Sequence, residues 1–184
     1  GGNNLIWTDE STIAYIDNNQ VYAYDYQSKA KKDLDQTAEF LWDGGSKVLG
    51  VNYEDIEIEN EDGSVDFTNK ISIDSVDGKI SEEFTNESVV NYIVAENGIK
   101  YIEKYSHDKG YSLVTHNGTD IEALGYGTGY ILDLSDKDNK MIVRNMNTGD
   151  YFVYHTDTNE WDNITMDLTY SLLQRKEGAN KWRN

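Results

Sequence analysis

The chain has 184 residues, of which 38% are hydrophobic and 12% aromatic, so it is long enough to bury a core and too aromatic for a disordered tail. Its 34 acidic and 16 basic residues give a formal net charge of −18, which disfavours binding to nucleic acid or anionic lipid surfaces, and it has no apolar run of the roughly 18 residues that a membrane span needs. Cysteine and proline are both absent, which excludes disulfides and thiolate metal sites and leaves turns to Gly, Asn, Asp and Ser.

The chain begins with Gly1-Gly2 and no methionine, and we interpret residues 1–2 as a cleavage scar. Residues 3–174 are predicted to form one domain of four similar units, each with two short apolar runs followed by a hairpin. The units cover about residues 4–37, 38–86, 87–125 and 126–167, and their hairpins are residues 20–34, 70–84, 110–124 and 150–164. The second unit is longer than the others, and we predict that its acidic residues 57–66 are an insertion in a loop.

Turn residues lie at equivalent places in three of the hairpins: Asp77-Gly78, Asn117-Gly118 and Asp157-Thr158. Asp-Gly and Asn-Gly are strong hairpin signals because their residues tolerate positive φ. Each unit therefore has four predicted strands in about 40 residues, which is the size of a propeller blade. The sequence predicts an all-β, propeller-like repeat domain of about four four-stranded antiparallel blades, with helix limited to a turn or two near the C-terminus.

Residues 7–34, WTDESTIAYIDNNQVYAYDYQSKAKKDL, contain a Trp, a polar turn, a strand and a second hairpin in that order. Residues 40–51, FLWDGGSKVLGV, repeat the first half of this pattern. Over residues 5–51 the chain resembles the repeats of bacterial TolB-like β-propellers and of the propeller domains attached to prolyl-oligopeptidase relatives. It lacks the proline of the family's Trp-turn segment, and its last two units lack the Trp of the first strand. The resemblance implies a β-propeller without the hydrolase domain that carries the chemistry in the peptidase relatives.

Residues 168–174, LTYSLLQ, are predicted to form one more strand, and residues 175–184 a basic tail. Four blades are the lower limit for a closed propeller. The extra strand would either complete the first blade and close the ring or open a fifth blade. A third possibility is a homodimer in which two chains form a larger ring.

No group of residues in the sequence has the pattern of a catalytic site. In the repeat alignment His116 and His155 point to opposite faces of their strands, whereas a zinc site needs about three convergent ligands. Ser46 lies in a Gly-Gly-Ser-Lys-Val segment that lacks the closing glycine of a nucleophile elbow. We therefore expect no enzymatic activity and no catalytic cofactor.

Calcium is the candidate metal, because acidic turns supply the oxygen ligands that it takes. One candidate site lies in the loop predicted after the strand at residue 130 and consists of Asp133, Asp136, Asp138 and Asn139. A second lies in the insertion and consists of Glu57, Glu59, Glu61 and Asp62. Neither has the calcium-loop spacing with glycine at the sixth position, and the alternative interpretation is a solvated acidic loop.

The 14 tyrosines and 4 tryptophans provide candidate ligand-binding residues, namely Trp7, Trp42, Tyr126 and Tyr130. In addition, Tyr22, Tyr24 and Tyr26 alternate along one predicted strand and so share one of its faces. Such tyrosine ladders more often pack across strands than bind ligands.

The favoured function is a non-enzymatic binding or scaffold module that contacts a protein or peptide within an extracytoplasmic bacterial protein. The net charge favours a cationic partner. One alternative is a carbohydrate-binding module, or a glycan-active enzyme, that uses exposed aromatics and paired carboxylates. Another is a structural half of a larger propeller.

Overall fold

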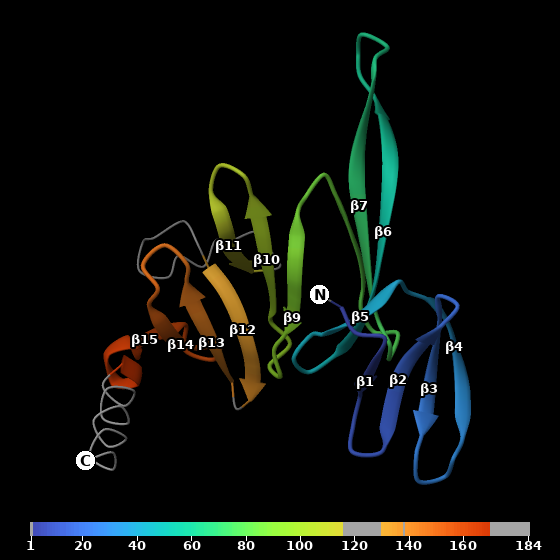
Figure 1. The fold of residues 1–184 in the computed structure, drawn as a ribbon, viewed down its shortest axis with the longest axis horizontal. Coiled ribbons are helices and arrows are strands. Elements are labelled where there is room, and N and C mark those ends of the chain that lie inside the picture. Colours follow the sequence, from blue (N-terminus) through green and yellow to red (C-terminus); the bar gives the residue numbers. More distant parts are fainter. Residues whose placement is uncertain (1, 116–129, 138, 170–184) are drawn as a thin grey trace, which may run out of the picture.

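A computed structural model describes residues 2–115, 130–137 and 139–169, with the backbone alone described for residues 130–137. These residues form four antiparallel sheets, each built from strands that follow one another in the chain (Figure 1). The all-β prediction is therefore confirmed.

Each sheet lies within one of the predicted repeat units. The first contains β1 (Leu5–Trp7), β2 (Thr12–Asp17), β3 (Gln20–Asp25) and β4 (Lys31–Thr37). The second contains β5 (Phe40–Asp43), β6 (Val48–Glu59), β7 (Val65–Ser75) and β8 (Ser81–Thr85). The third contains β9 (Val89–Val94), β10 (Lys100–Ser106) and β11 (Gly110–Thr115), and the fourth contains β12 (Tyr130–Lys137), β13 (Lys140–Asn145), β14 (Tyr151–His155) and β15 (Glu160–Asn163).

The turns use the residues that the composition predicts. Between β2 and β3, Asn18 and Asn19 have φ values of 47° and 62°, which is the two-residue turn whose twist matches a hairpin. Gly78 has a φ of 77° in the turn between β7 and β8. In a chain without proline, asparagine, aspartate and glycine thus supply the left-handed backbone positions of the described residues, with Lys29 at a φ of 63° as the exception.

The sheets pack face to face in a row, and three apolar cores lie between them. The first and second sheets share Ala14, Val21, Ala38, Leu41 and Val48. The second and third share Trp42, Leu49, Val51, Ile71, Ile73, Ile80, Val89, Tyr92, Val94, Ile102 and Val114, and the third and fourth share Ile93, Ala95, Tyr101, Leu113, Met141, Val143 and Tyr154.

Neighbouring residues of the middle strands face different cores. Tyr101 lies in the core toward the fourth sheet and Ile102 in the core toward the second. Leu41 and Trp42 divide in the same way between the two cores on either side of the second sheet. The middle sheets therefore bury both faces, as stacked blades do.

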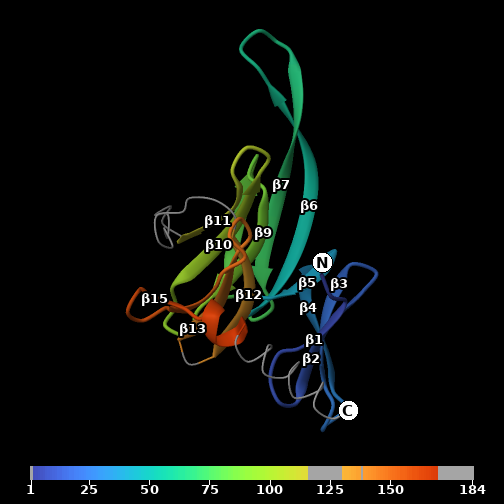
Figure 2. The ribbon, with the colours of Figure 1, turned by 60° about the vertical axis from the view of Figure 1, so that its left-hand side comes forward.

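The first and fourth sheets lie at opposite ends of the row (Figures 1 and 2). The described part of the chain is therefore an open arc and not a closed ring. One face of the first sheet packs on the second sheet, and its other face is an end of the row.

The strands predicted at the C-terminal end and at the end of the third unit lie wholly or partly outside the described residues. Leu168 and Thr169 belong to a helical turn at residues 165–169, in which the Leu168 N–H bonds the Ile164 carbonyl at 3.1 Å, so the strand predicted at 168–174 is wrong at its start. Residues 170–174 lie outside the described residues, as does the fourth strand predicted for the third unit near residues 121–124.

The acidic insertion is also different from the prediction. Residues 57–59 and 65–66 are strand, because β6 and β7 continue past their neighbours as a long hairpin. The alternation in Ile56-Glu57-Ile58-Glu59 is the period-two pattern of a strand, and the acidic composition concealed it.

Candidate functional site

The outer face of the first sheet exposes a group of large apolar side chains. The pairing of β1, β2 and β3 sets Leu5, Tyr15 and Tyr22 in one row and Trp7, Ile13 and Tyr24 in the next. Tyr26 follows β3 and packs against Trp7, with the ring centroids 5.7 Å apart. We call these residues the aromatic face: Leu5, Trp7, Ile13, Tyr15, Tyr22, Tyr24 and Tyr26.

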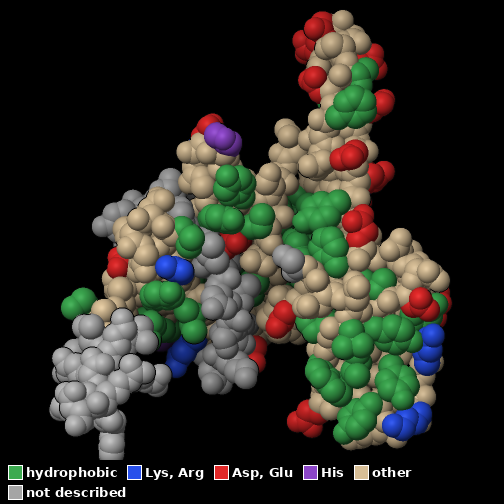
Figure 3. Space-filling view, in the orientation of Figure 1, with side chains coloured by type: hydrophobic (Ala, Val, Ile, Leu, Met, Phe, Trp, Pro, Cys, Tyr) green, Lys and Arg blue, Asp and Glu red, His purple; other side chains and the backbone are tan. Residues whose placement is uncertain are grey.

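Solvent reaches this face, in contrast to the opposite face of the same sheet. Leu5 is 61% exposed, Trp7 54% and Tyr26 43%, whereas Ala14 and Val21 on the inner face are 0% exposed. Figure 3 shows the hydrophobic side chains gathered over β1 to β4. Contiguous exposed apolar surface of this kind marks a binding surface more often than scattered single residues do.

A cation lies on the aromatic face. The Tyr15 and Tyr22 rings stack with centroids 5.4 Å apart, and Lys31 Nζ lies 4.2 Å from the Tyr22 centroid. A side-chain hydrogen bond with Tyr15 raises the pKa of Lys31, so this lysine stays charged at neutral pH. The face therefore combines apolar rings with a fixed positive charge.

Two more lysines lie beside Lys31 at the β4 edge. Lys29, Lys31 and Lys32 are exposed and make no salt bridge with a described carboxylate. In contrast, Lys47, Lys70, Lys100 and Lys104 each pair with Asp or Glu. On the aromatic face, however, Lys31 pairs with Tyr24 and Asp33 with Tyr22, whereas Lys32 pairs with Ala23 on the inner face, so one lysine and one aspartate lie at this edge of the aromatic face.

The second sheet carries another exposed feature, which we call the hairpin arm, residues 52–69. β5 pairs with β6 as far as Val51, and β8 pairs with β7 as far as Lys70, so the two long strands continue alone beyond these points. The arm projects from the body of the molecule (Figure 1). Its exposed apolar residues are Tyr53, Ile58, Val65 and Phe67, and its acidic residues are Glu54, Asp55, Glu57, Glu59, Glu61, Asp62 and Asp66.

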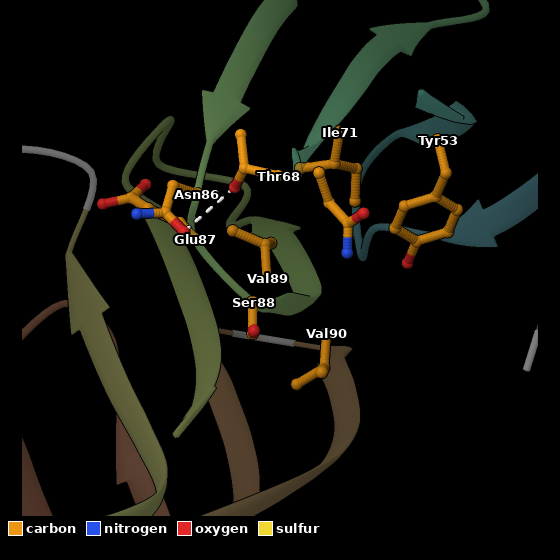
Figure 4. A pocket seen from close by; sticks show the side chains of 9 residues that line it. Tyr53, Thr68, Ile71, Asn86, Glu87, Ser88, Val89 and Val90 are labelled. Carbon is orange, nitrogen blue, oxygen red and sulfur yellow. Dashed lines mark hydrogen bonds between the residues drawn. The ribbon is translucent and has the colours of Figure 1, made fainter. Parts of the chain in front are cut away.

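A hollow of about 230 Å³ lies at the base of the arm (Figure 4). Tyr53, Thr68 and Ile71 line one side of it and residues 86–90 the other, and Asn86 Oδ1 accepts a hydrogen bond from Thr68 Oγ1 at 3.0 Å. The charged residue in its lining, Glu87, pairs with Lys104 Nζ at 3.0 Å. The hollow offers amide and hydroxyl groups rather than an acid and base pair.

A second hollow of about 270 Å³ lies where the first and second sheets meet, and Asp77 is among its lining residues. Burial disfavours the charge on Asp77, but hydrogen bonds from Lys47 Nζ and Ser75 Oγ, both at 2.6 Å, outweigh it and lower its pKa to about 2. This carboxylate is therefore ionised at neutral pH and tied to its own turn, which is a structural role.

The predicted aromatic ligand residues are not brought together. Trp7 lies on the aromatic face, but Trp42 is 7% exposed and packs in the core between the second and third sheets, so no surface ligand reaches it. Its burial follows from the position of β5 between two stacked sheets. Tyr130 begins β12, where the structure describes the backbone alone, and Tyr126 lies outside the described residues.

The structure describes the predicted calcium site in part. Asp133 and Asp136 belong to β12 and not to a loop after it, because β12 continues to Lys137. Asp138 lies outside the described residues, and Asn139 forms the turn into β13 with a φ of 60°. Among the described side chains, which include the four acids predicted on the arm, no three His, Asp or Glu come together as a metal site.

The residues considered for catalysis are separate from one another. His107 is fully exposed beside Asp108, and His155 Nε2 lies 2.7 Å from Asp162 Oδ2 across β14 and β15. Ser46 Oγ donates to the Val94 carbonyl at 2.8 Å, and His116 lies outside the described residues. Ser46 therefore ties the second sheet to the third and lies away from both described histidines in the fold.

The fold and these surfaces define an all-β protein of stacked, blade-like antiparallel sheets with one aromatic end face. No family model matches the chain, and no curated protein matches it. The described residues include no helix of the length and apolar character that crossing a bilayer requires.

Proposed function

We propose that this chain is a non-enzymatic interaction module that binds a protein or peptide partner on the aromatic face. The observation that carries the proposal is the contrast between the two faces of the first sheet. The inner face is buried, whereas the outer face exposes Leu5, Trp7 and Tyr26 to solvent. Covering a large apolar side chain stabilises a complex by about 2 kcal/mol. Aromatic residues at the centre of a surface are typical binding hot spots.

The local charge defines the chemistry of the partner. The net charge of −18 favours a cationic partner for the molecule as a whole. At the aromatic face Lys31 lies over the Tyr15 and Tyr22 rings, so the segment that binds there supplies a carboxylate beside apolar side chains. Lys31 on the Tyr22 ring is the group that such a carboxylate meets.

Three strand peptides test this proposal. The first alternates Val and Phe with Glu, the second replaces Glu with Lys, and the third replaces the apolar residues with Ser. We expect the first to bind best, with an affinity that falls as salt rises because the charges at the rim are exposed. Binding is measured by isothermal titration calorimetry.

Matched variants locate the binding surface. Trp7→Ser and Tyr24→Ser are expected to weaken binding about tenfold or more. Ile142→Ser, at a 39% exposed position of the fourth sheet, is the control and is expected to bind like the wild type. Equal binding by all three variants, or a preference for the lysine peptide, contradicts the proposal.

A carbohydrate-binding module is the second candidate, because the half-exposed Trp7 and Tyr26 rings are side chains that stack on sugars. Their planes meet at 85°, so the two rings do not form one flat platform. This geometry favours an amphipathic protein segment over a sugar ring. Glycan-array binding that Trp7→Ser abolishes, without any peptide binding, would reverse this preference.

A further inference from the structure

The hollow at the base of the hairpin arm is built by three segments of the chain. β6 supplies Tyr53, β7 supplies residues 68, 69 and 71, and the connection from β8 to β9 supplies residues 86–88, followed by the first residues of β9. Figure 4 shows Tyr53 at one side of the hollow and Asn86 with Glu87 at the other. Its volume of about 230 Å³ has room for one small ring, and it is below the roughly 300 Å³ at which pockets for drug-sized ligands begin.

Hydrogen bonds fix the connection that forms one wall of the hollow. Asn86 has a φ of 56°, and its N–H donates to the Asn69 carbonyl at 2.9 Å. Thr68 Oγ1 donates to Asn86 Oδ1 at 3.0 Å. On the side of the third sheet, the Ser88 carbonyl accepts from the Tyr105 N–H at 2.9 Å. The wall is therefore held in place before any ligand enters, and such preorganisation lowers the entropy cost of binding.

The polar side chains around the hollow keep hydrogen-bonding capacity for a ligand. No described residue makes a hydrogen bond to the Asn69 side-chain amide, the Ser88 hydroxyl or the Tyr53 hydroxyl. Asn86 keeps its Nδ2 as a donor, because its bond with Thr68 uses Oδ1. Two amides and two hydroxyls therefore offer donors and acceptors from both sides of the hollow.

Apolar surface lies between these polar groups. Ile71 and Val89 form the floor of the hollow and are 2% and 3% exposed. Tyr53 is 44% exposed, and Phe40 packs against it with the ring centroids 5.5 Å apart, which holds the Tyr53 ring at the edge. The ring and the aliphatic floor suit C–H groups of a ligand, whereas the amides and hydroxyls suit its polar groups.

The charges near the hollow favour an uncharged ligand. Glu87 is the charged residue of the lining, and Lys104 Nζ pairs with it at 3.0 Å, so an amine finds no unpaired carboxylate there. Asp55 pairs with Asn69 across the arm, and residues 52–69 contain no lysine or arginine. The acidic surroundings therefore disfavour a carboxylate or a phosphate.

A sugar ring combines these properties, because it is uncharged, has hydroxyls around its rim and has apolar C–H groups on its faces. We propose that the hollow binds a neutral hexopyranose, with its C–H groups on Tyr53 and its hydroxyls bonded to the Asn69 and Asn86 amides. A peptide backbone also bonds to amides, but it needs an extended groove, and this hollow has room for one ring. The site is separate from the aromatic face and does not depend on the proposed function.

Titration of the whole chain with the methyl glycosides of glucose, galactose and mannose tests the proposal. At least one glycoside is expected to bind with a dissociation constant of about 1 mM, as suits a small ligand in an open site, and to shift the side-chain amide signals of Asn69 and Asn86 in NMR spectra. Sodium glucuronate is expected to bind more weakly than the glucoside, because its carboxylate meets acidic surroundings. Absence of these shifts with all three glycosides, or tighter binding of glucuronate, overturns the proposal.

Matched variants locate the site. Tyr53→Ala and Asn69→Ala are each expected to weaken glycoside binding about tenfold or more, whereas Tyr53→Phe keeps the ring and loses less. Phe67→Ser is the control, since Phe67 is exposed on the same face of the arm but does not line the hollow. The dispersion of the backbone amide signals shows that each variant is folded. Unchanged binding in Tyr53→Ala and Asn69→Ala, or an equal loss in Phe67→Ser, contradicts the proposal.

Trp7→Ser distinguishes this site from the aromatic face. This variant is expected to bind the glycoside like the wild type while it loses the Val, Phe and Glu peptide. Peptide binding without glycoside binding overturns the sugar site and leaves the proposed function standing. Glycoside binding that Trp7→Ser abolishes would place the sugar on the aromatic face and also overturn this proposal.

Discussion

Asp77 shows how a single turn residue contributes to stability through its charge. Its carboxylate accepts hydrogen bonds from Lys47 Nζ, Ser75 Oγ and the Lys79 N–H, and its pKa is lowered to about 2. A carboxylate whose pKa is lower in the folded than in the unfolded chain stabilises the fold above its unfolded pKa, near 3.9. That contribution is lost as the pH falls from about 4 toward 2.

Asp77→Asn is therefore expected to lower the melting temperature at pH 7, and the difference from the wild type is expected to shrink as the pH falls toward 2. Thermal unfolding followed by circular dichroism at several pH values measures it. Glu61→Gln at the exposed tip of the arm is the control and leaves the melting temperature unchanged. A difference that is the same at pH 7 and pH 2.5 would show that the charge of Asp77 is not the cause.

At the scale of elements, the hairpin arm and the sheets differ in what holds them. No residue of the arm belongs to the three cores, and the nearest core residue is Ile71 at its base. Each sheet, in contrast, contributes residues to at least one core. Glu54 and Lys70 face each other at the base of the arm, where a short turn can join the two strands.

Replacing residues 55–69 with an Asn-Gly turn is expected to change the free energy of unfolding by less than about 1 kcal/mol, because the lost contacts are exposed. Urea denaturation measures this change. A loss of several kcal/mol would mean that the arm is part of the folded core.

Across the whole molecule, each of the three apolar cores couples the stability of two neighbouring sheets. Leu41 is 0% exposed and lies in the core between the first and second sheets. In such a row each sheet depends chiefly on its neighbours, so a cavity in one core loosens the adjoining sheets before the distant one.

Leu41→Ala is expected to cost about 2 to 5 kcal/mol. Amide hydrogen exchange is expected to speed up more in β1 to β4 than in β13 to β15. Met141→Ala, in the core between the third and fourth sheets, is the matched variant. Its amide exchange is expected to speed up more in β13 to β15 than in β1 to β4. Equal acceleration in all four sheets after either change would show a single cooperative unit.

The repeat units and their turns were open to prediction because they depend on local chemistry. Asp77-Gly78 predicts a tight turn from its own residues, and the structure has β7 and β8 on either side of it. Leu168 and Thr169 were not predictable in this way, since a short apolar run suits a strand or a helical turn equally. The arm was not predicted, because the many acidic residues around Ile56 to Glu59 obscure the period-two alternation of a strand.

Antiparallel sheets of alternating apolar strands follow from the residues alone, because side-chain period and turn residues act within a few positions. Which apolar residues stay exposed depends instead on how the sheets pack against one another. Trp7 and Trp42 are alike in sequence pattern, yet Trp42 is buried and Trp7 is not. The physical reason is that burial depends on whether another sheet covers that face, and β5 lies between two sheets whereas the outer face of β1 lies at the end of the row.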